Sequence, residues 1–182
     1  MSRYRRANTP GVTYFFTVVT YRRREFLCDV AVRQALREAI SKVRLQYPFL
    51  IDGWVLLPDH LHAIWTLPPG DANFSLRWQL IKRYVSRQCG GDLHQPVLMS
   101  DSKIKHREST LWQRRYWEHV IRDEADFERH MDYLHYNPVK HGVVSQVKDW
   151  PHSSFHRCVE KGIYAEDWAE ITLPDNGRFG EV

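Results

Sequence analysis

Two histidines one residue apart are the first residues in this sequence that could do chemistry. His60-Leu61-His62 directly follows a Pro-Asp pair and opens a run of apolar residues with the composition of a β-strand. Side chains two apart on a strand point to the same face, so both imidazoles would lie together while Leu61 faces the other way. Two such imidazoles supply half of a divalent metal site, and burying them without partners would be costly. The pair predicts a metal site.

A second polar group falls in a helical segment further along the chain. Asp126, His130, Tyr133 and Asn137 are spaced by four, three and four residues, so they lie on one helix face beside an apolar stripe. A phenol and an amide oxygen one turn apart could close a site against the histidine strand. The same pattern also fits a helix whose tyrosine packs at the edge of the core and whose asparagine caps the end.

These residues need a scaffold, and hydrophobic periodicity predicts one. Gly90-Gly91 is expected to end one helix and Asn137-Pro138 another, while residues 92–110 read as an irregular loop. The expected strands are 11–20, 50–57, 60–67 and 111–121, and the expected helices are 29–46, 74–89 and 123–136. This order predicts an α+β fold, with an antiparallel sheet, helices packed on one of its faces, and a plan close to ferredoxin-like.

Composition sets the class of protein. The chain has 182 residues, which fits one compact domain. We expect this domain to span 1–159, followed by an acidic tail at 160–182. No run of residues is long and apolar enough to predict a membrane helix, and no secretory signal is recognisable. Three widely spaced cysteines favour neither a disulfide framework nor a cysteine zinc site, so we expect a cytoplasmic protein.

Charge and aromatic residues predict a polyanionic partner. The net charge is only +4, but residues 76–122 hold ten basic side chains against four acidic ones. Several aromatic residues stand beside these cations, as in Trp112-Gln113-Arg114-Arg115-Tyr116-Trp117. Stacking surfaces next to positive charges are what single-stranded nucleic acid requires. A solvated basic face and aromatic rings buried in the core would give the same pattern.

Taken together, the motifs resemble those of the HUH nucleases. Residues 57–62 look like their His-hydrophobe-His motif, and residues 132–142 look like the helix of their single-tyrosine transposases. The greatest likeness is to the REP-associated tyrosine transposases. Segments 13–18, 112–119 and 150–154 agree with that family in the same order, so the resemblance runs from about residue 3 to residue 157.

The resemblance implies a ferredoxin-like HUH nuclease fold and a metal-dependent enzyme that cleaves and transfers single-stranded DNA. Its substrates would be hairpins of repetitive extragenic palindromes with a flanking guide sequence, cut through a covalent 5′-phosphotyrosine. By match to the motifs, Tyr133 is the nucleophile and His60 and His62 bind the metal, Mg²⁺ or Mn²⁺. Asn137 stands where the family supplies a further ligand. The family contains sites built from one chain and from two, so both a monomer and a homodimer stay open.

Helix geometry favours the same tyrosine. Asn137 lies one turn past Tyr133 on one face, whereas it is turned about 100° from Tyr136. Tyr133 is therefore the phenol expected to share a site with Asn137.

The DNA contacts are expected from the basic clusters. An N-terminal arm would reach the guide bases, while a helix and a later segment would hold phosphates. These residues are Arg3, Arg5 and Arg6 in the arm, Lys82, Arg83 and Arg87 on the helix, and Arg114 and Arg115 in the segment.

Three other functions fit parts of the sequence. A replication-initiator or relaxase nickase would share the histidine pair and the tyrosine. A binding module on a ferredoxin-like sheet would need the basic and aromatic residues but no metal site. A small metallohydrolase would need a base to activate water, for which Asp59 is the nearby candidate.

Overall fold

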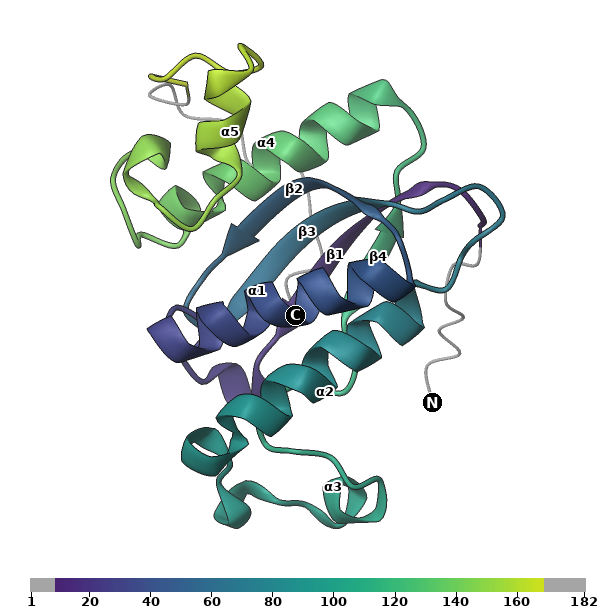
Figure 1. Cartoon of the computed structure of the whole chain (residues 1–182). Coiled ribbons are helices and arrows are strands. Elements are labelled where there is room, and N and C mark those ends of the chain that lie inside the picture. The colour runs from purple at the N-terminus through teal and green to yellow at the C-terminus, as the bar shows by residue number, and fades with distance from the viewer. Residues whose placement is uncertain (1–8, 169–182) are drawn as a thin grey trace.

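Four antiparallel strands form the centre of the molecule, in the order β2-β3-β1-β4 (Figure 1). The computed structural model describes residues 9–168. The strands are β1 (Thr13–Val19), β2 (Leu50–Leu56), β3 (His60–Thr66) and β4 (Trp117–Val120). A sheet with this order, reached through β-α-β-β-α-β connections, is the ferredoxin-like arrangement. The predicted fold class is confirmed.

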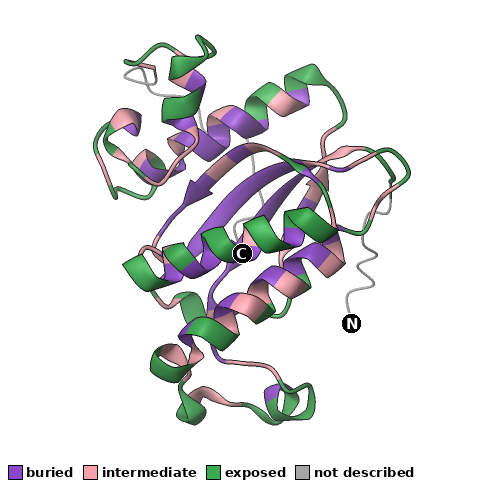
Figure 2. Cartoon of the chain, in the orientation of Figure 1, coloured by how far each residue is buried: buried purple, intermediate pink, exposed green. Residues whose placement is uncertain are grey.

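Helices cover both faces of the sheet, so the expectation of helices on one face is wrong. Helices α1 (Val30–Gln46) and α2 (Phe74–Leu93) lie on one face, and α4 (Glu124–Lys140) lies on the other (Figure 1). The reason is visible in β1, where Tyr14 and Phe16 join the core beneath α1 and α2 while Phe15 points to α4. Since both faces are apolar, both must be covered, and Figure 2 shows the strands buried between the two helical layers.

Helix α4 approaches the sheet closely at Gly53 of β2. A Cβ atom added to Gly53 would stand 2.7 Å from Sδ of Met131 and 3.2 Å from Cδ1 of Leu134. A methyl group at residue 53 would therefore force the side chains of Met131 and Leu134 to shift, and the glycine lets the helix lie close to the strands.

Helix α4 also runs further than the sequence predicts. Pro138 lies within the helix, which ends at Lys140 and is followed by His141 and Gly142. Gly142 has φ +66°, and its N–H donates to the carbonyl of Val139, as expected where a helix terminates in a left-handed residue. Because proline has no N–H, Pro138 removes one backbone hydrogen bond from the last turns of the helix. Its ring is buried, and the free energy of that burial offsets the lost bond.

Two further boundaries differ from the prediction. Helix α2 passes through Gly90-Gly91 and ends at Leu93, because Leu93 packs against the core and its carbonyl accepts a hydrogen bond from Arg24. The expected loop at 92–110 contains the short helix α3 (Asp101–Lys105). Buried Lys103 anchors that segment by donating to the carbonyls of Ser109 and Trp112.

The last part of the sheet is shorter than expected. Only residues 117–120 of the predicted strand at 111–121 belong to β4, while Trp112 makes an isolated bridge to Thr20. Beyond α4, a short helix α5 (Phe155–Glu160) follows, and Tyr164 and Trp168 pack on Phe155. Among residues 9–168, no helix has the length and apolar character that crossing a membrane requires.

Candidate active site

Both histidines of β3 face helix α4. In the antiparallel register, His60 pairs with Val19 of β1 and His62 with Thr17. Leu61 points the other way, into the core beneath α1 and α2. The expectation that strand alternation places the two imidazoles on one face is therefore correct, and their ring centroids are 5.0 Å apart.

Helix α4 brings an amide and a phenol to these imidazoles. The Oδ1 atom of Asn137 lies 3.2 Å from Nε2 of His60, and the ring centroid of Tyr133 lies 5.3 Å from that of His62. His62 and Asn137 are fully buried, and Tyr133 is 9% exposed. The structure thus gathers the four residues that the sequence singled out, from two elements that are far apart in the chain.

The Nδ1 atom of each histidine has a hydrogen-bond partner on the side of the ring away from Nε2. Nδ1 of His60 lies 2.6 Å from a carboxylate oxygen of Asp59, and Nδ1 of His62 lies 2.9 Å from Oγ1 of Thr17. Burial raises the pKa of Asp59, but the hydrogen bond and charge of His60, together with Arg23, outweigh it and lower the pKa to about 2. A carboxylate that stays ionised fixes the ring and makes its far nitrogen a better electron-pair donor.

Whether a metal fits depends on the far nitrogens of the two imidazoles and on the Asn137 oxygen. With Nδ1 of His60 against the Asp59 carboxylate, its Nε2 lies 3.2 Å from Oδ1 of Asn137, so a nitrogen and an oxygen of the kinds that bind metals stand side by side. That separation is close to the roughly 3 Å between neighbouring ligands of an octahedral ion held at about 2.1 Å. Nε2 of His62 is buried and has no hydrogen-bond partner among the described residues. These donors fit a divalent cation.

The protonation state of His62 is consistent with this. Burial, followed by the charges of His60 and His141, holds the pKa of His62 well below its ordinary value. A neutral imidazole keeps the lone pair that a metal needs.

Tyr133 has a defined position beside the histidines. Phe15 of β1 packs against it, with ring centroids 6.0 Å apart, and Phe15 also packs on His62 at 5.3 Å. The ammonium of Lys140 lies 5.1 Å from the Tyr133 ring centroid, so positive charge faces the phenol. Tyr136 is half-buried on a different side of α4. The geometry agrees with the choice of Tyr133 over Tyr136 made from helix periodicity.

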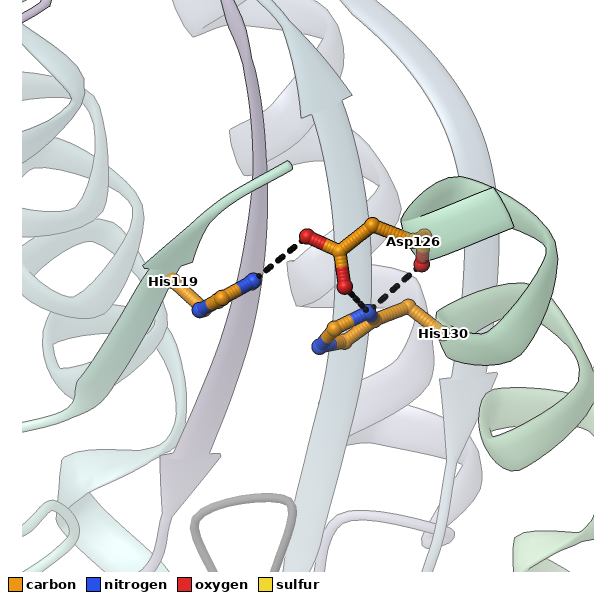
Figure 3. A group of neighbouring side chains, drawn as sticks. All are labelled: His119, Asp126 and His130. Carbon is orange, nitrogen blue, oxygen red and sulfur yellow. Dashed lines mark hydrogen bonds and ion pairs between the residues drawn. The ribbon is translucent and has the colours of Figure 1, made fainter. Parts of the chain in front are cut away.

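A second group of possible metal ligands lies at the start of α4. Ligand atoms of His119, Asp126 and His130 all lie within 4.8 Å of one another (Figure 3). The two oxygens of the buried Asp126 carboxylate, however, already pair with the guanidinium groups of Arg122 and Arg129, each at 3.1 Å. A cation placed there would meet the positive charges of these two arginines, so we interpret this group as an ion-pair network between β4 and α4.

Four of the eight expected DNA-contact residues line one groove of about 700 Å³ between α2 and residues 106–116. Arg83 and Arg87 are exposed in it. Lys82 instead turns inward and donates to the carbonyl of Gln113, and Arg114 pairs with Glu108, so these two organise the groove wall. Arg115 is exposed beside the groove without lining it, and Arg3, Arg5 and Arg6 lie outside the described residues.

Sequence reasoning missed the residues that support the site. The sequence suggests Asp59 only as a base for water, although its place directly before His60 also indicates a support for that ring. Thr17 reaches His62 only through the β1–β3 register, and Lys140 reaches Tyr133 only because α4 continues past Pro138. Neither relationship has a local signal in the sequence.

Comparison with known proteins is consistent with this geometry. Residues 8–137 match the profile of a family described as "Transposase IS200 like". An Escherichia coli K12 protein, "REP-associated tyrosine transposase", is 47% identical over 169 residues, covering 93% of this chain and 92% of its own length. A Haemophilus influenzae relative is 45% identical over 169 residues, covering 92% and 93%. A solved structure of a REP-associated tyrosine transposase bound to a REP hairpin covers 98% of both chains, with a TM-score of 0.80 and 45% identity.

Proposed function

The chain belongs to the IS200-like transposase family and is a DNA transposase, and we propose that it cuts single-stranded DNA beside hairpins of repetitive extragenic palindromes. The family resemblance inferred from the sequence motifs is confirmed. The hairpin substrate is supported by the solved relative at 45% identity, which is bound to a REP hairpin. The observation that carries the proposal within this chain is the placement of Tyr133 against the His60–His62 pair by α4.

Each residue of the site has a role in the proposed reaction. The phenolic oxygen of Tyr133 attacks the scissile phosphorus, a P–O bond to tyrosine forms, and the bond from phosphorus to the 3′ oxygen breaks. The phenol gives up its proton, the leaving 3′ oxygen takes one up, and the 5′ phosphate stays on the enzyme. Because the phosphodiester energy is kept in phosphotyrosine, a 3′ hydroxyl can reverse the step or join a new strand without ATP.

The supporting residues place the reacting groups. We assign His60, His62 and Asn137 as ligands of Mg²⁺ or Mn²⁺, which when bound would polarise a non-bridging phosphate oxygen. Asp59 and Thr17 hold the two imidazoles in orientation. Phe15 limits the rotamers of Tyr133, and Lys140 places positive charge at the ring that becomes anionic.

The test is a cleavage assay on a REP hairpin carrying single-stranded flanks, labelled in turn at each end. With Mg²⁺ or Mn²⁺, we expect one cleaved strand with a free 3′ end and one SDS-resistant adduct on the 5′ phosphate. A second labelled strand with a 3′ hydroxyl should become joined to the adduct. A strand of the same composition that cannot fold is the control. Binding without any cleavage would contradict the proposal, and cleavage without transfer would indicate a nickase.

A further inference from the structure

A second basic groove lies at the β2 edge of the sheet, away from α2. It has a volume of about 410 Å³ and runs between α1 and residues 151–157, with part of β2 as its floor. The free edge of β2 is closed there by hydrogen bonds, because Leu56 donates to the carbonyl of His152 and Ser154 donates to that of Trp54. The groove is therefore formed by segments that are fixed to the sheet.

The groove is positively charged and has no acidic lining residue. Its walls carry Arg33 and Arg37 from α1 on one side, and His152 and Arg157 on the other. After burial, the charges of Arg33 and Arg37 are the causes that lower the pKa of His152, so these groups face one another across the groove. Like charges brought together without a counter-ion favour an anionic ligand.

Two carboxylates on the elements that form the groove are engaged elsewhere. Glu38 follows Arg37 on α1, but it accepts hydrogen bonds from Tyr84 and Gln34. Asp52 of β2 accepts from Thr66. Neither side chain lines the groove, so neither neutralises it.

The arginines keep donors available for a ligand. Arg33 uses Nε on the carbonyl of Cys28, and Arg157 uses one terminal nitrogen on the carbonyls of Ile51 and Asp52. A guanidinium has five N–H donors, so each retains several after these bonds. The bonds also orient the side chains, which lowers the entropy lost when a phosphate binds. The half-buried indole of Trp54 adds an aromatic surface to the same groove.

The groove borders the proposed cleavage site. Leu56 lies at the end of the groove and is four residues before His60, so the two are at most about 14 Å apart along the backbone. The other wall includes His152. The chain that leads to it, residues 141–152, starts at His141, whose ring centroid is 5.0 Å from that of His60. A few nucleotides of single strand would span this distance.

We propose that this groove, at the β2 edge of the sheet and away from the α2 groove, holds phosphates of the single strand that flanks the hairpin. The proposal rests on the proposed function, because it assumes that hairpin DNA is the substrate. It assigns two contacts to the enzyme: the stem binds towards α2 and β4, and the flanking strand follows the β2 edge. The residues that hold the strand are Arg33, Arg37, His152 and Arg157, with Trp54 available for stacking.

The experiment compares Arg33→Gln/Arg37→Gln with Lys42→Gln/Arg44→Gln, a control with the same charge change on the same helix outside this groove. Fluorescence anisotropy would give the affinity for a bare hairpin and for hairpins with a ten-nucleotide 5′ or 3′ extension. Wild type should bind one extended hairpin at least tenfold more tightly than the bare one. The first variant should lose that gain and bind the bare hairpin normally, with a salt slope lower by about 1.4, roughly 0.7 per lost phosphate contact. The control should keep the gain.

Three results would overturn the proposal. The two variants could lose equal affinity for the extended hairpin, or the first variant could lose equal affinity for bare and extended hairpins. Wild type could also bind neither extended hairpin more tightly than the bare one. Failure of wild type to bind or cut any hairpin would instead refute the proposed function. Photo-crosslinking of wild type to 5-iodouridine in the extension tests the groove without any variant. Adducts on peptides containing Trp54 or His152 support it, and adducts confined to α2 contradict it.

Discussion

Nε2 of His60 and Oδ1 of Asn137 lie 3.2 Å apart although 77 positions separate them in the chain. This pair joins the sheet to the helix that carries Tyr133, so the proposed ligands and the proposed nucleophile share one rigid framework. Any ion bound between them would bridge β3 and α4.

Replacing Asn137 by Ala, or His62 by Ala, should weaken Mn²⁺ binding at least tenfold, since each removes one of the three proposed ligands. Asn137→Asp keeps an oxygen ligand and should retain binding. Titration of free Mn²⁺ by EPR measures this without any DNA. His119→Ala is the matched control, because it removes a histidine of the Asp126 network. Loss of Mn²⁺ in His119→Ala, with normal binding in Asn137→Ala, would move the metal to that network.

Tyr133→Phe should bind hairpin DNA like wild type yet form no covalent adduct, because the attacking oxygen is missing while the ring still packs on Phe15. Tyr136→Phe should keep the adduct, since Tyr136 lies on another side of α4. Mass spectrometry of the trapped complex identifies the modified peptide and residue. A nucleotide found on Tyr136 or Tyr116 would refute this assignment.

Experiments should distinguish the exposed arginines of the α2 groove, which we expect to bind phosphates, from Lys82, which stabilises the groove wall. Arg83→Gln/Arg87→Gln should lower the salt slope of hairpin binding by about 1.8, or 0.9 per phosphate contact. Lys82→Ala should instead cost about 1 kcal/mol of folding stability, because it removes the bond to the Gln113 carbonyl. Anisotropy at several salt concentrations and thermal unfolding give the two quantities. If Lys82→Ala changed the slope alone, Lys82 would be a phosphate contact as the sequence suggested.

Asp126 should make the free energy of unfolding decrease at acidic pH. Burial raises its pKa, but hydrogen bonds from Arg122 and His119 outweigh this and hold the pKa well below the ordinary value. The stabilisation is therefore complete above about pH 4 and is lost as the pH falls further. Asp126→Asn should lower the free energy of unfolding by about 2 kcal/mol at pH 7, and the difference from wild type should narrow in acid. Denaturant titrations at several pH values check this, with exposed Glu128→Gln as a control that changes little.

The sequence predicts the parts of the site that depend on local periodicity. Alternation along β3 places His60 with His62, and the helical repeat places Tyr133 with Asn137. What it misses depends on contacts between distant segments. Proline and glycine rules end α4 at Asn137 and α2 at Gly90, yet burial of Pro138 and Leu93 extends both helices. Thr17 supports His62 only through strand register, and the inward turn of Lys82 depends on the position of Gln113.

The close packing of α4 on β2 at Gly53 has a consequence for the kinetics of cleavage. Since α4 places Tyr133 beside His62 of the same polypeptide, we expect each molecule to carry a full set of reacting groups. Turnover per molecule should then be independent of protein concentration. Mixing His62→Ala with Tyr133→Phe should not restore cleavage, since neither molecule can lend its intact half to the other. Recovery of activity in that mixture would reveal exchange of the helix between two subunits, and a larger side chain at residue 53 would be the means to provoke it.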